Sequence, residues 1–280
     1  RRKDFLSLTP QDENALQRLN GLLGDKAPGF IESFYEHLLS FSETRALIPD
    51  EGTLARLKKS QSSYFKSLIA GVYDRAYLDA ITWWMQTRHG WQVARDEIFT
   101  THGLVNGTGL CLQAFTQPGD GVVLTTPVYH AFARTIKAAG RQVVECQLTN
   151  TNGRYEMDFA AWDAQMTGTE TMFILCSPHN PGGRVWTPEE LRGVAEFCKR
   201  HNLLLVSDEI HHDLVMPGQT HTVMANAAPE IADRLVMMTA TTKTFNIAGA
   251  HIGNVIVADP VLRGKFANTM MKMGISPKSF

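Results

Sequence analysis

The sequence predicts an α/β fold built on a mainly parallel sheet, with an all-helical segment in front of it. From about residue 98, short apolar runs alternate with amphipathic stretches of helical spacing. This alternation is typical of parallel strands joined by crossover helices. Most of the runs are almost continuously apolar, as expected of strands that helices cover on both faces. Before about residue 80, the apolar residues show only helical spacing.

The N-terminal segment is expected to contain three helices. The first begins at Pro10 and ends near Gly24, because proline is favoured in the first helical turn and glycine just after the last one. The second covers residues 30–38 and the third residues 53–69, each with apolar side chains on one face.

The second part of the chain is expected to form the sheet. Its strands are predicted at residues 122–126, 142–148, 172–176, 203–206, 235–238 and 254–257. The amphipathic stretches between them, such as residues 131–139 and 188–201, are predicted to be helices. Ligands of such sheets bind beyond the carboxyl ends of the strands. The residues that follow the runs are therefore the candidates for a functional site.

Composition narrows the class of protein. The 280 residues are 44% hydrophobic and 20% charged, with a formal net charge of −1, which excludes a disordered chain and a basic surface that attracts nucleic acid or membrane. No apolar stretch reaches about 18 residues, and no signal core follows the charged N-terminus. The four cysteines are scattered and are expected to be reduced and mostly buried. We therefore expect a cytoplasmic protein without a nucleic-acid or membrane partner.

Lys243 is the first candidate for chemistry. It lies in the segment TTKTFN, a few residues after the predicted strand at 235–238. A lysine among hydroxyl side chains at a strand end is expected to be partly desolvated, which lowers the pKa of its amine and makes it a nucleophile toward a carbonyl carbon. The alternative is a surface lysine that merely follows a strand. Taken alone, Lys243 favours this alternative.

The segment SDEIHHD, residues 207–213, follows the predicted strand at 203–206. Asp208 and Glu209 place two carboxylates at the end of a buried strand, which is unfavourable unless cations or hydrogen-bond donors meet them. His211 and His212 are adjacent and therefore face different ways, so we do not expect both to bind one metal ion. At least one of them can be a packing residue.

Three further motifs are weaker. Asn180 lies in a Pro- and Gly-rich turn that aims its amide, or is simply part of a tight turn. Tyr129 follows a strand and is available for stacking, or is an ordinary half-buried tyrosine. Residues 101–107, THGLVNG, form a glycine-bearing turn into a helix, and the N-terminus of a helix binds phosphate. The spacing of these glycines matches neither a Walker loop nor the dinucleotide fingerprint.

Together the motifs provide each group that pyridoxal phosphate (PLP) requires. These groups are an amine for the aldehyde, a carboxylate for the ring nitrogen, an amide for the ring hydroxyl, an aromatic face and a helix N-terminus for the phosphate. All of them lie in separate loops at predicted strand ends. The sequence therefore predicts PLP as the cofactor.

Residues 77–280 resemble the large domain of the fold-type-I PLP enzymes, the aspartate aminotransferase superfamily, and within it the cystathionine β-lyase-type C–S lyases. The matching segments are WMQTRHGW (84–91), TPVYHAF (126–132), GRYEMDF (153–159), SPHNPGGRVW (177–186), SDEIHHDL (207–214) and TKTFNIAG (242–249). The resemblance implies a seven-stranded-type, mainly parallel sheet with helices on both faces. It also implies a homodimer with active sites at the interface.

The resemblance implies a role at the cofactor ring for five residues. Lys243 forms the Schiff base with PLP and later acts as the general base. Asp208 pairs with the ring nitrogen and Asn180 bonds to the ring hydroxyl. Tyr129 stacks on the ring, and His211 stands where many relatives carry a tyrosine near the ring hydroxyl.

Around the phosphate the resemblance implies five more positions. The backbone N–H groups of Gly103, Leu104 and Val105 hold the phosphate, and Thr242 stands where a phosphate-contacting serine is common. His251 occupies the place of an arginine that many aminotransferases use to bind the phosphate. This departure is consistent with the lyase branch.

The implied reaction is β-elimination of a sulfur amino acid. Cystathionine or a cysteine conjugate would give a thiol, an oxo acid and ammonia, so the expected partner is a small amino-acid substrate. A PLP-dependent aminotransferase is the nearest alternative, since it shares the steps up to proton removal from Cα. A fragment with the PLP-type core but without turnover is a further alternative.

Residues 4–78 resemble the first half of a globin-coupled sensor domain, a haem-binding oxygen sensor, through residues 34–46 and 53–71. Tyr35 falls on the distal-pocket tyrosine of that family. The proximal histidine has no counterpart, because His89 belongs to the lyase-like segment WMQTRHGW. We therefore expect an apparent chimera of residues 1–76 and 77–280 that does not bind haem stably, with a haem-based sensor as the alternative.

Fold-type-I enzymes usually continue into a small domain whose arginine binds the substrate carboxylate, and Phe280 precedes it. We expect this small domain to be absent, and the chain to be a weak or inactive enzyme as a result. Arg184 is the nearest substitute for the missing arginine. The sequence favours an ion pair between Arg184 and Glu189 or Glu190 at least as strongly as this substitute role.

Overall fold

The computed structural model describes residue 29 and residues 31–45, 48, 50–69 and 75–275. The chain divides into two compact units between Leu78 and Asp79, close to the boundary expected after residue 76. Helix α5 (Arg75–His89) begins in the first unit and ends in the second. The segment WMQTRHGW therefore belongs to the second unit.

The described part of the first unit is helical. It contains a helix at residues 31–39, α3 (Ser42–Arg45) and α4 (Glu51–Ile69). Two of the three expected helices are thus confirmed, whereas the one predicted from Pro10 lies outside the described residues. Tyr35 is buried, with the ring of Phe34 edge-on at 5.5 Å, and its burial raises the pKa of the tyrosine hydroxyl.

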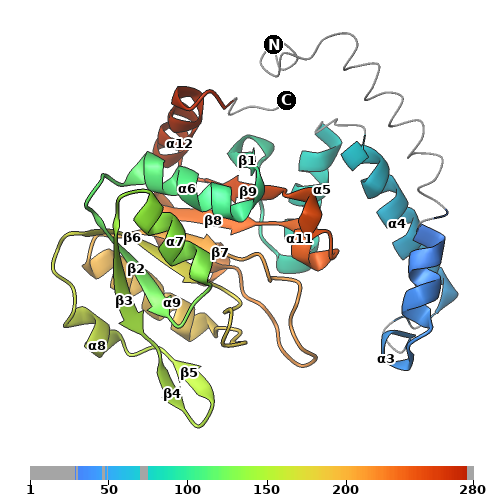
Figure 1. Cartoon of the computed structure of the whole chain (residues 1–280), viewed down its shortest axis with the longest axis horizontal. Coiled ribbons are helices and arrows are strands. Elements are labelled where there is room, and N and C mark those ends of the chain that lie inside the picture. Colours follow the sequence, from blue (N-terminus) through green and yellow to red (C-terminus); the bar gives the residue numbers. More distant parts are fainter. Residues whose placement is uncertain (1–28, 30, 46–47, 49, 70–74, 276–280) are drawn as a thin grey trace. The chain divides into compact units, whose positions relative to one another are not determined.

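The second unit is built on a seven-stranded sheet, counted over the described residues (Figure 1). Its strands are β1 (Ile98–Thr101), β2 (Gly121–Thr126), β3 (Gln142–Gln147), β6 (Glu170–Cys176), β7 (Leu204–Asp208), β8 (Leu235–Thr239) and β9 (Gly253–Ile256), in the spatial order β1-β9-β8-β7-β6-β2-β3. The neighbours of β9 pair with it antiparallel and all other pairs are parallel. Only β9 therefore runs against the other strands, and the predicted, mainly parallel sheet is confirmed.

All six predicted strands form, and three short ones were not predicted. Strand β1 has only four residues, two of which are threonines, and so gives little apolar signal. Strands β4 (Thr149–Thr151) and β5 (Arg154–Glu156) form a separate antiparallel hairpin whose side chains are mostly exposed. An exposed hairpin of three-residue strands leaves no hydrophobic pattern to detect.

Helices cover both faces of the sheet. One face carries α6 (Gly103–Phe115), α7 (His130–Ala138) and α12 (Pro260–Lys272), and the other carries α8 (Phe159–Asp163), α9 (Pro188–Arg200) and α10 (Met224–Ala227). The remaining helices are the single turn α11 (Thr241–Thr244) and 3₁₀ turns at Arg95–Glu97, Pro229–Arg234 and Ala248–Ala250. No described helix is long and apolar enough to cross a lipid bilayer.

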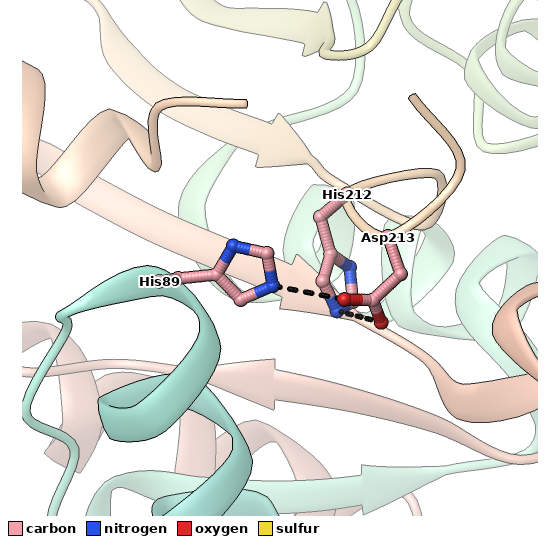
Figure 2. Close-up of side chains that lie close together, drawn as sticks. All are labelled: His89, His212 and Asp213. Carbon is pink, nitrogen blue, oxygen red and sulfur yellow. Dashed lines mark hydrogen bonds and ion pairs between the residues drawn. The ribbon is translucent and has the colours of Figure 1, made fainter. Parts of the chain in front are cut away.

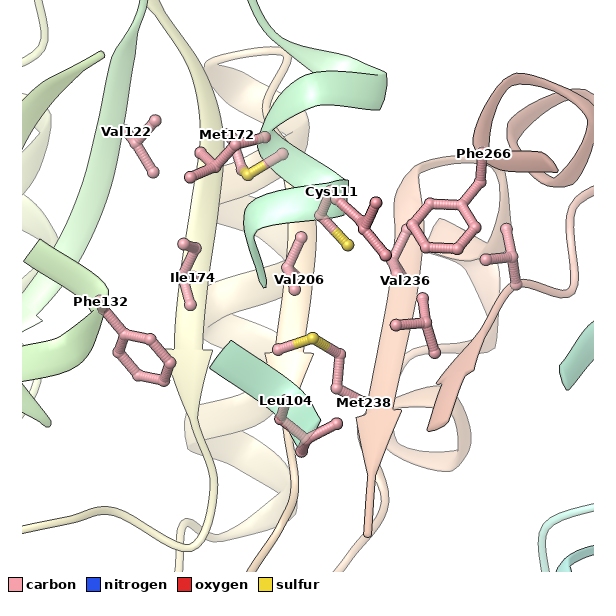
Figure 3. Close-up of a cluster of buried hydrophobic side chains, with 14 of the residues drawn as sticks. Leu104, Cys111, Val122, Phe132, Met172, Ile174, Val206, Val236, Met238 and Phe266 are labelled. Carbon is pink, nitrogen blue, oxygen red and sulfur yellow. The ribbon is translucent and has the colours of Figure 1, made fainter. Parts of the chain in front are cut away.

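Strand β6 shows why the predicted strands are continuously apolar. Met172 and Ile174 point toward α6, in a cluster with Leu104 and Cys111 (Figure 3). Phe173, between them, packs on the opposite face against Phe197 of α9, with ring centroids 6.0 Å apart. Because successive strand side chains point to opposite faces, a strand covered on both sides needs an apolar residue at every position.

Candidate active site

The candidate residues gather at one edge of the sheet. Since only β9 is reversed, the carboxyl ends of β1, β2, β6, β7 and β8 meet there. In the order of the sheet, this edge carries the loop with Lys243 after β8, Asp208 at the end of β7, Asn180 after β6 and Tyr129 after β2. Helix α6 starts beyond β1, as predicted. The topology thus collects the residues that the sequence placed in five separate loops.

The two adjacent carboxylates at the end of β7, Asp208 and Glu209, have different surroundings. Glu209 accepts hydrogen bonds from Ser207 Oγ and the Met224 N–H, each at 2.9 Å, and its other oxygen lies 2.8 Å from His221 Nε2. Asp208 is equally buried, but the only donor found for it among the described residues is the Ile210 N–H, at 3.1 Å. Burial, reinforced by the charge of Glu209, raises the pKa of Asp208 to about 7.

This difference indicates different roles for Asp208 and Glu209. A buried carboxylate with a full set of donors is a structural group, whereas one that lacks a cationic partner is costly to ionise and marks a ligand site. The sequence had predicted that both carboxylates need cations or donors. The structure supplies three partners to Glu209 and one backbone N–H to Asp208. His221, twelve residues downstream, was not predicted, and nothing local in the sequence pairs it with Glu209.

Lys243 corrects an expectation. Its side chain is exposed, which contradicts the expected partly desolvated amine and agrees with the stated alternative of a surface lysine after a strand. The reason is helical geometry, because successive residues of the single turn α11 face about 100° apart, so that Thr242 is buried and Lys243 points outward. Burial lowers the pKa of half-buried His211, and the charge of Lys243 adds to this effect.

The start of helix α6 is a tight backbone junction. Gly103 has φ of +77°, and the residue before it, His102, provides no side-chain cap. A side chain on Gly253 of β9 would meet the backbone of Gly103 and Leu104 at 2.9–3.0 Å, so only glycine fits there. The rings of His102 and His251 stack beside this junction, 5.1 Å apart. Val105 is exposed in the first turn.

Asn180 lies in the turn after β6, and Tyr129 lies in the loop after β2. The Asn180 N–H lies 3.4 Å from Cys176 Sγ, and the residue is half-buried. The half-buried ring of Tyr129 lies edge-on to that of Phe132 at 5.6 Å.

Several hydroxyl groups at the same edge are buried without a hydrogen-bond partner among the described residues. They are those of Thr126, Ser177 and Thr239, at the ends of β2, β6 and β8. Buried polar groups are normally paired, so an edge with three unpaired hydroxyls and one carboxylate without a cation fits a polar, partly cationic ligand. A protonated pyridine ring with oxygen substituents has this chemistry.

Arg184 is engaged elsewhere. Its Nη2 atom lies 2.6 and 2.8 Å from the two carboxylate oxygens of Glu190, and its guanidinium stacks over Trp186 at 4.6 Å. Nη1 donates to the Tyr155 carbonyl. The alternative interpretation of Arg184, a partner for a local carboxylate, is therefore confirmed with Glu190.

A cluster around Asp213 was not predicted. We define the Asp213 network as Trp84, His89, His212, Asp213 and Thr244. Figure 2 shows His89 and His212 directed at the Asp213 carboxylate, with Nε2–oxygen distances of 3.1 and 3.0 Å. Trp84 Nε1 and Thr244 Oγ1 donate to the same carboxylate at 3.0 and 2.8 Å. Burial opposes ionisation of Asp213, but these donors outweigh it and hold the pKa of the carboxyl well below its usual range.

Both ring nitrogens of His212 face acceptors. Nδ1 lies 2.5 Å from the Glu209 carbonyl oxygen and Nε2 lies 3.0 Å from Asp213 Oδ2. Neither oxygen can donate, so each nitrogen carries a proton and the ring is an imidazolium. Burial works against this charge, but the contact with Asp213 raises the pKa of His212 above its ordinary value.

One nitrogen or oxygen from each of His89, His212 and Asp213 lies within 4.8 Å of the others, close enough to bind a metal ion. The carboxylate, however, already accepts four donors, which use the lone pairs a metal would need. We therefore interpret the cluster as a hydrogen-bonded network. Because His89 contributes to it, the interpretation of His89 as a residue of the α/β unit is supported.

A surface hollow of about 600 Å³ lies elsewhere, lined by residues such as Trp83, Val93 and Glu97. Glu97 precedes β1, so the hollow lies toward the start of that strand, whereas the candidate residues follow strand ends. It contains none of the candidate residues. We do not assign the chemistry to it.

The parallel sheet, with its chemistry-bearing loops at one edge, defines a cofactor-binding α/β unit. The sequence profile of the family described as aminotransferase class I and II matches residues 40–276, most of the chain. The chain therefore belongs to the class I and II aminotransferase family.

Individual relatives agree with this assignment. Cystathionine beta-lyase PatB of Bacillus subtilis is 39% identical over 203 residues, which are 72% of this chain and 52% of PatB. The crystal structure of cystalysin from Treponema denticola, which contains a pyridoxal 5'-phosphate cofactor, is 38% identical with a TM-score of 0.70, covering 73% of this chain and 52% of cystalysin. The PLP-bound C-S lyase from Staphylococcus hominis is 30% identical with a TM-score of 0.68, covering 71% and 51%.

These relatives support the predicted cofactor, since both solved structures hold PLP. The chain spans about half the length of the curated relatives it matches. The family profile begins at residue 40, within the segment predicted to resemble a sensor domain. These comparisons therefore do not support a sensor segment or a chimera.

Proposed function

We propose that this chain carries the PLP-binding domain of a C–S lyase acting on a sulfur amino acid, such as cystathionine or a cysteine conjugate. The observation that carries the proposal is Asp208, a buried carboxylate that lacks a cationic partner, at the edge where the Lys243 loop also begins. The lyase relatives support the reaction type.

PLP, when bound, supplies a ring that accepts the electrons released at the substrate Cα. Asp208 would hold a proton on the ring nitrogen, and the charge pair so formed would satisfy the carboxylate. Asn180 would donate to the ring hydroxyl beside His211, and Tyr129 would cover one face of the ring. The first N–H groups of α6, at Gly103, Leu104 and Val105, would bind the phosphate, with Thr242 and His251 next to them.

Lys243 would provide both the covalent attachment and the base. As a free amine, Lys243 would take the proton from the substrate Cα. The Cβ–S bond would then break, and sulfur would leave with the bonding electron pair and become a thiol on protonation. Water hydrolyses the remaining unsaturated amino acid to an oxo acid and ammonia.

Borohydride trapping tests the assignment. The purified chain is mixed with PLP, its near-visible absorbance is recorded, and the reduced protein is mapped by peptide mass spectrometry. We expect a pyridoxyl group on Lys243, its loss in Lys243→Ala, and no change in Lys265→Ala, which removes an exposed lysine on α12. A modified lysine elsewhere, with Lys243 untouched, would refute the proposal.

An aminotransferase is the second candidate, because the matching family is named for that activity. The two reactions differ in their products. A lyase releases thiol, oxo acid and ammonia from one substrate, whereas an aminotransferase releases no ammonia and requires a second oxo acid as acceptor. Measuring ammonia release without an added oxo acid distinguishes them.

A haem-based sensor in the first 78 residues is a candidate of another class, with the buried Tyr35 as the observation in its favour. We propose that haem is not bound stably, because Nε2 of His89 is already paired with Asp213. Haem titration followed at the Soret band is the test. A tight, stoichiometric complex that His89→Ala abolishes would favour the sensor instead.

We also propose a homodimer in the cytoplasm. The dimer follows from the family resemblance, and sedimentation equilibrium of the full chain tests it. The compartment is supported by the four cysteines, all buried and unpaired, since disulfides are rare in reducing compartments.

A further inference from the structure

Lys243 lies on an element that cannot hold itself in place. Helix α11 has four residues, and an isolated turn of this length is unstable because nucleation costs more than one turn of hydrogen bonds returns. The lysine side chain is exposed, so packing of Lys243 itself does not fix the turn. Its position must be set by the neighbouring side chains.

Two neighbours connect α11 to other elements. Thr244 Oγ1 donates a hydrogen bond of 2.8 Å to Asp213 Oδ2. The ring of Phe245 packs edge-on to Trp84 of α5, with centroids 5.4 Å apart. Trp84 in turn donates its indole N–H to Asp213. The contacts of Thr244 and Phe245 therefore both lead to the Asp213 network.

Asp213 is itself held from three sides. Donors reach its carboxylate from α5 (Trp84 and His89), from its neighbour His212 and from α11 (Thr244). Its side chain is 5% exposed and that of His212 is 3% exposed. The positive charge of the buried imidazolium balances the carboxylate, so the pair forms a neutral and rigid anchor next to the sheet edge.

We propose that Asp213 is a positioning residue for Lys243, and that it fixes the lysine-bearing turn through Thr244. The proposal deepens the proposed function, because it assumes that Lys243 is the reactive lysine. It assigns a role to residues that otherwise take no part in binding or chemistry. Asp208 would then act on the cofactor ring, and Asp213 would act on the lysine that reacts with it.

The sharpest test changes one hydroxyl group. Thr244→Val removes the donor but keeps the shape of the side chain, and Thr244→Ser keeps the donor. Thr269→Val on α12 is the matched control, since that hydroxyl bonds only to the Lys265 carbonyl of its own helix in the described structure. All variants are made in the full chain.

Two readouts are measured on each variant. The first is amide hydrogen exchange in peptides covering residues 240–247 and, for reference, strand β8, without cofactor. The second is the rate at which Lys243 becomes linked to added PLP, trapped with borohydride. We expect Thr244→Val to accelerate exchange in the α11 peptide and to slow linkage by about tenfold, the factor for one hydrogen bond to a charged acceptor. Thr244→Ser and Thr269→Val should stay within about twofold of the unmodified chain by the same reasoning.

The outcomes separate the two proposals. If Thr244→Val has the same amide exchange rate in α11 and the same rate of PLP linkage as the unmodified chain, the positioning role is wrong. It is also wrong if amide exchange rises equally in β8. Faster α11 exchange with unchanged linkage also overturns it. If the unmodified chain never links PLP through Lys243, the proposed function fails, while exchange localised to α11 still supports the anchor.

Discussion

Asp208 and Asp213 lie five positions apart on the same chain segment, and both are shielded from water, yet their surroundings are opposite. Asp213 accepts hydrogen bonds from four side chains, which hold the pKa of its carboxyl well below the usual range. Asp208 accepts one backbone N–H, and burial raises its pKa to about 7.

The difference teaches how a strand end can serve two purposes. A carboxylate that the fold fully satisfies contributes to stability, whereas one left without a cation is kept for a ligand at a cost to the folded state. Burial alone does not separate the two roles. The number of hydrogen-bond donors separates the two roles. It predicts that removing the carboxylate changes stability by a different amount and with a different sign at the two sites.

The largest expected effect is the loss of the anchor. Asp213→Ala leaves the His212 imidazolium buried without its partner, and we expect a loss of about 3–5 kcal/mol in the free energy of unfolding. Urea unfolding followed by tryptophan fluorescence measures it, because all five tryptophans belong to the second unit. A loss below about 1 kcal/mol, the level of a surface ion pair, would show that the network is not an anchor.

Asp208→Ala should instead affect turnover. We expect a loss of about 2–5 kcal/mol of transition-state stabilisation, at least about 30-fold in rate, because the ring proton loses its partner. Oxo-acid release from cystathionine is the measurement, with PLP absorbance as the control that the cofactor still binds. Unchanged turnover with bound PLP would contradict the role of Asp208.

The same site should show a stability change of the opposite sign. A carboxyl whose folded pKa lies above its unfolded value of about 3.9 destabilises the fold increasingly as pH rises from about 4 to 7. Asp208→Asn should therefore stabilise the cofactor-free protein at pH 8, by about 1–3 kcal/mol, and less at pH 5. Urea midpoints at the two pH values provide the comparison, and a destabilised variant at pH 8 would argue that Asp208 is already satisfied.

The smallest expected effect is the pH window of the anchor. His212, with a raised folded pKa, adds stability below about pH 6.5 that is lost as pH rises through that pKa. Asp213, with a lowered folded pKa, adds stability above about pH 4 that is lost as pH falls. A double-mutant cycle of His212→Gln and Asp213→Asn should show a coupling of about 1 kcal/mol at pH 6 that shrinks at alkaline pH. A coupling that grows with pH would reverse this assignment of charges.

Most of the sheet could be predicted because its central strands are covered on both faces and so have nearly continuous apolar runs, as in residues 172–176. The edge strand β3 is an exception, since most of its side chains are exposed or half-buried. Strand β1 and the β4–β5 hairpin could not be predicted, because four-residue and exposed strands leave no such pattern. The candidate site could be predicted because its residues follow strands that share one direction. The network was missed because most of its contacts join residues far apart in the sequence, 129 positions between Trp84 and Asp213 and 31 between Thr244 and Asp213.

The sequence could give the exposure of Lys243 only as an alternative to a partly desolvated amine. The hydroxyl-rich segment around it suggests an enclosed site, but which side of a single helical turn faces inward is set by tertiary contacts. Thr242 takes the inward position. Sequence spacing determines that the two residues differ in burial, and it does not determine which of them is buried.

The burial of the four thiols has a consequence for side reactions of the protein with thiols and aldehydes. Cys111, Cys146, Cys176 and Cys198 are all buried, and burial raises the pKa of each. Only thiolates exchange with disulfides or add to aldehydes at useful rates. A protein that releases thiols beside an aldehyde cofactor would otherwise modify itself, through mixed disulfides or cofactor adducts. Under the proposed function, thiols that stay protonated and buried would leave the Lys243 amine as the nucleophile for the aldehyde.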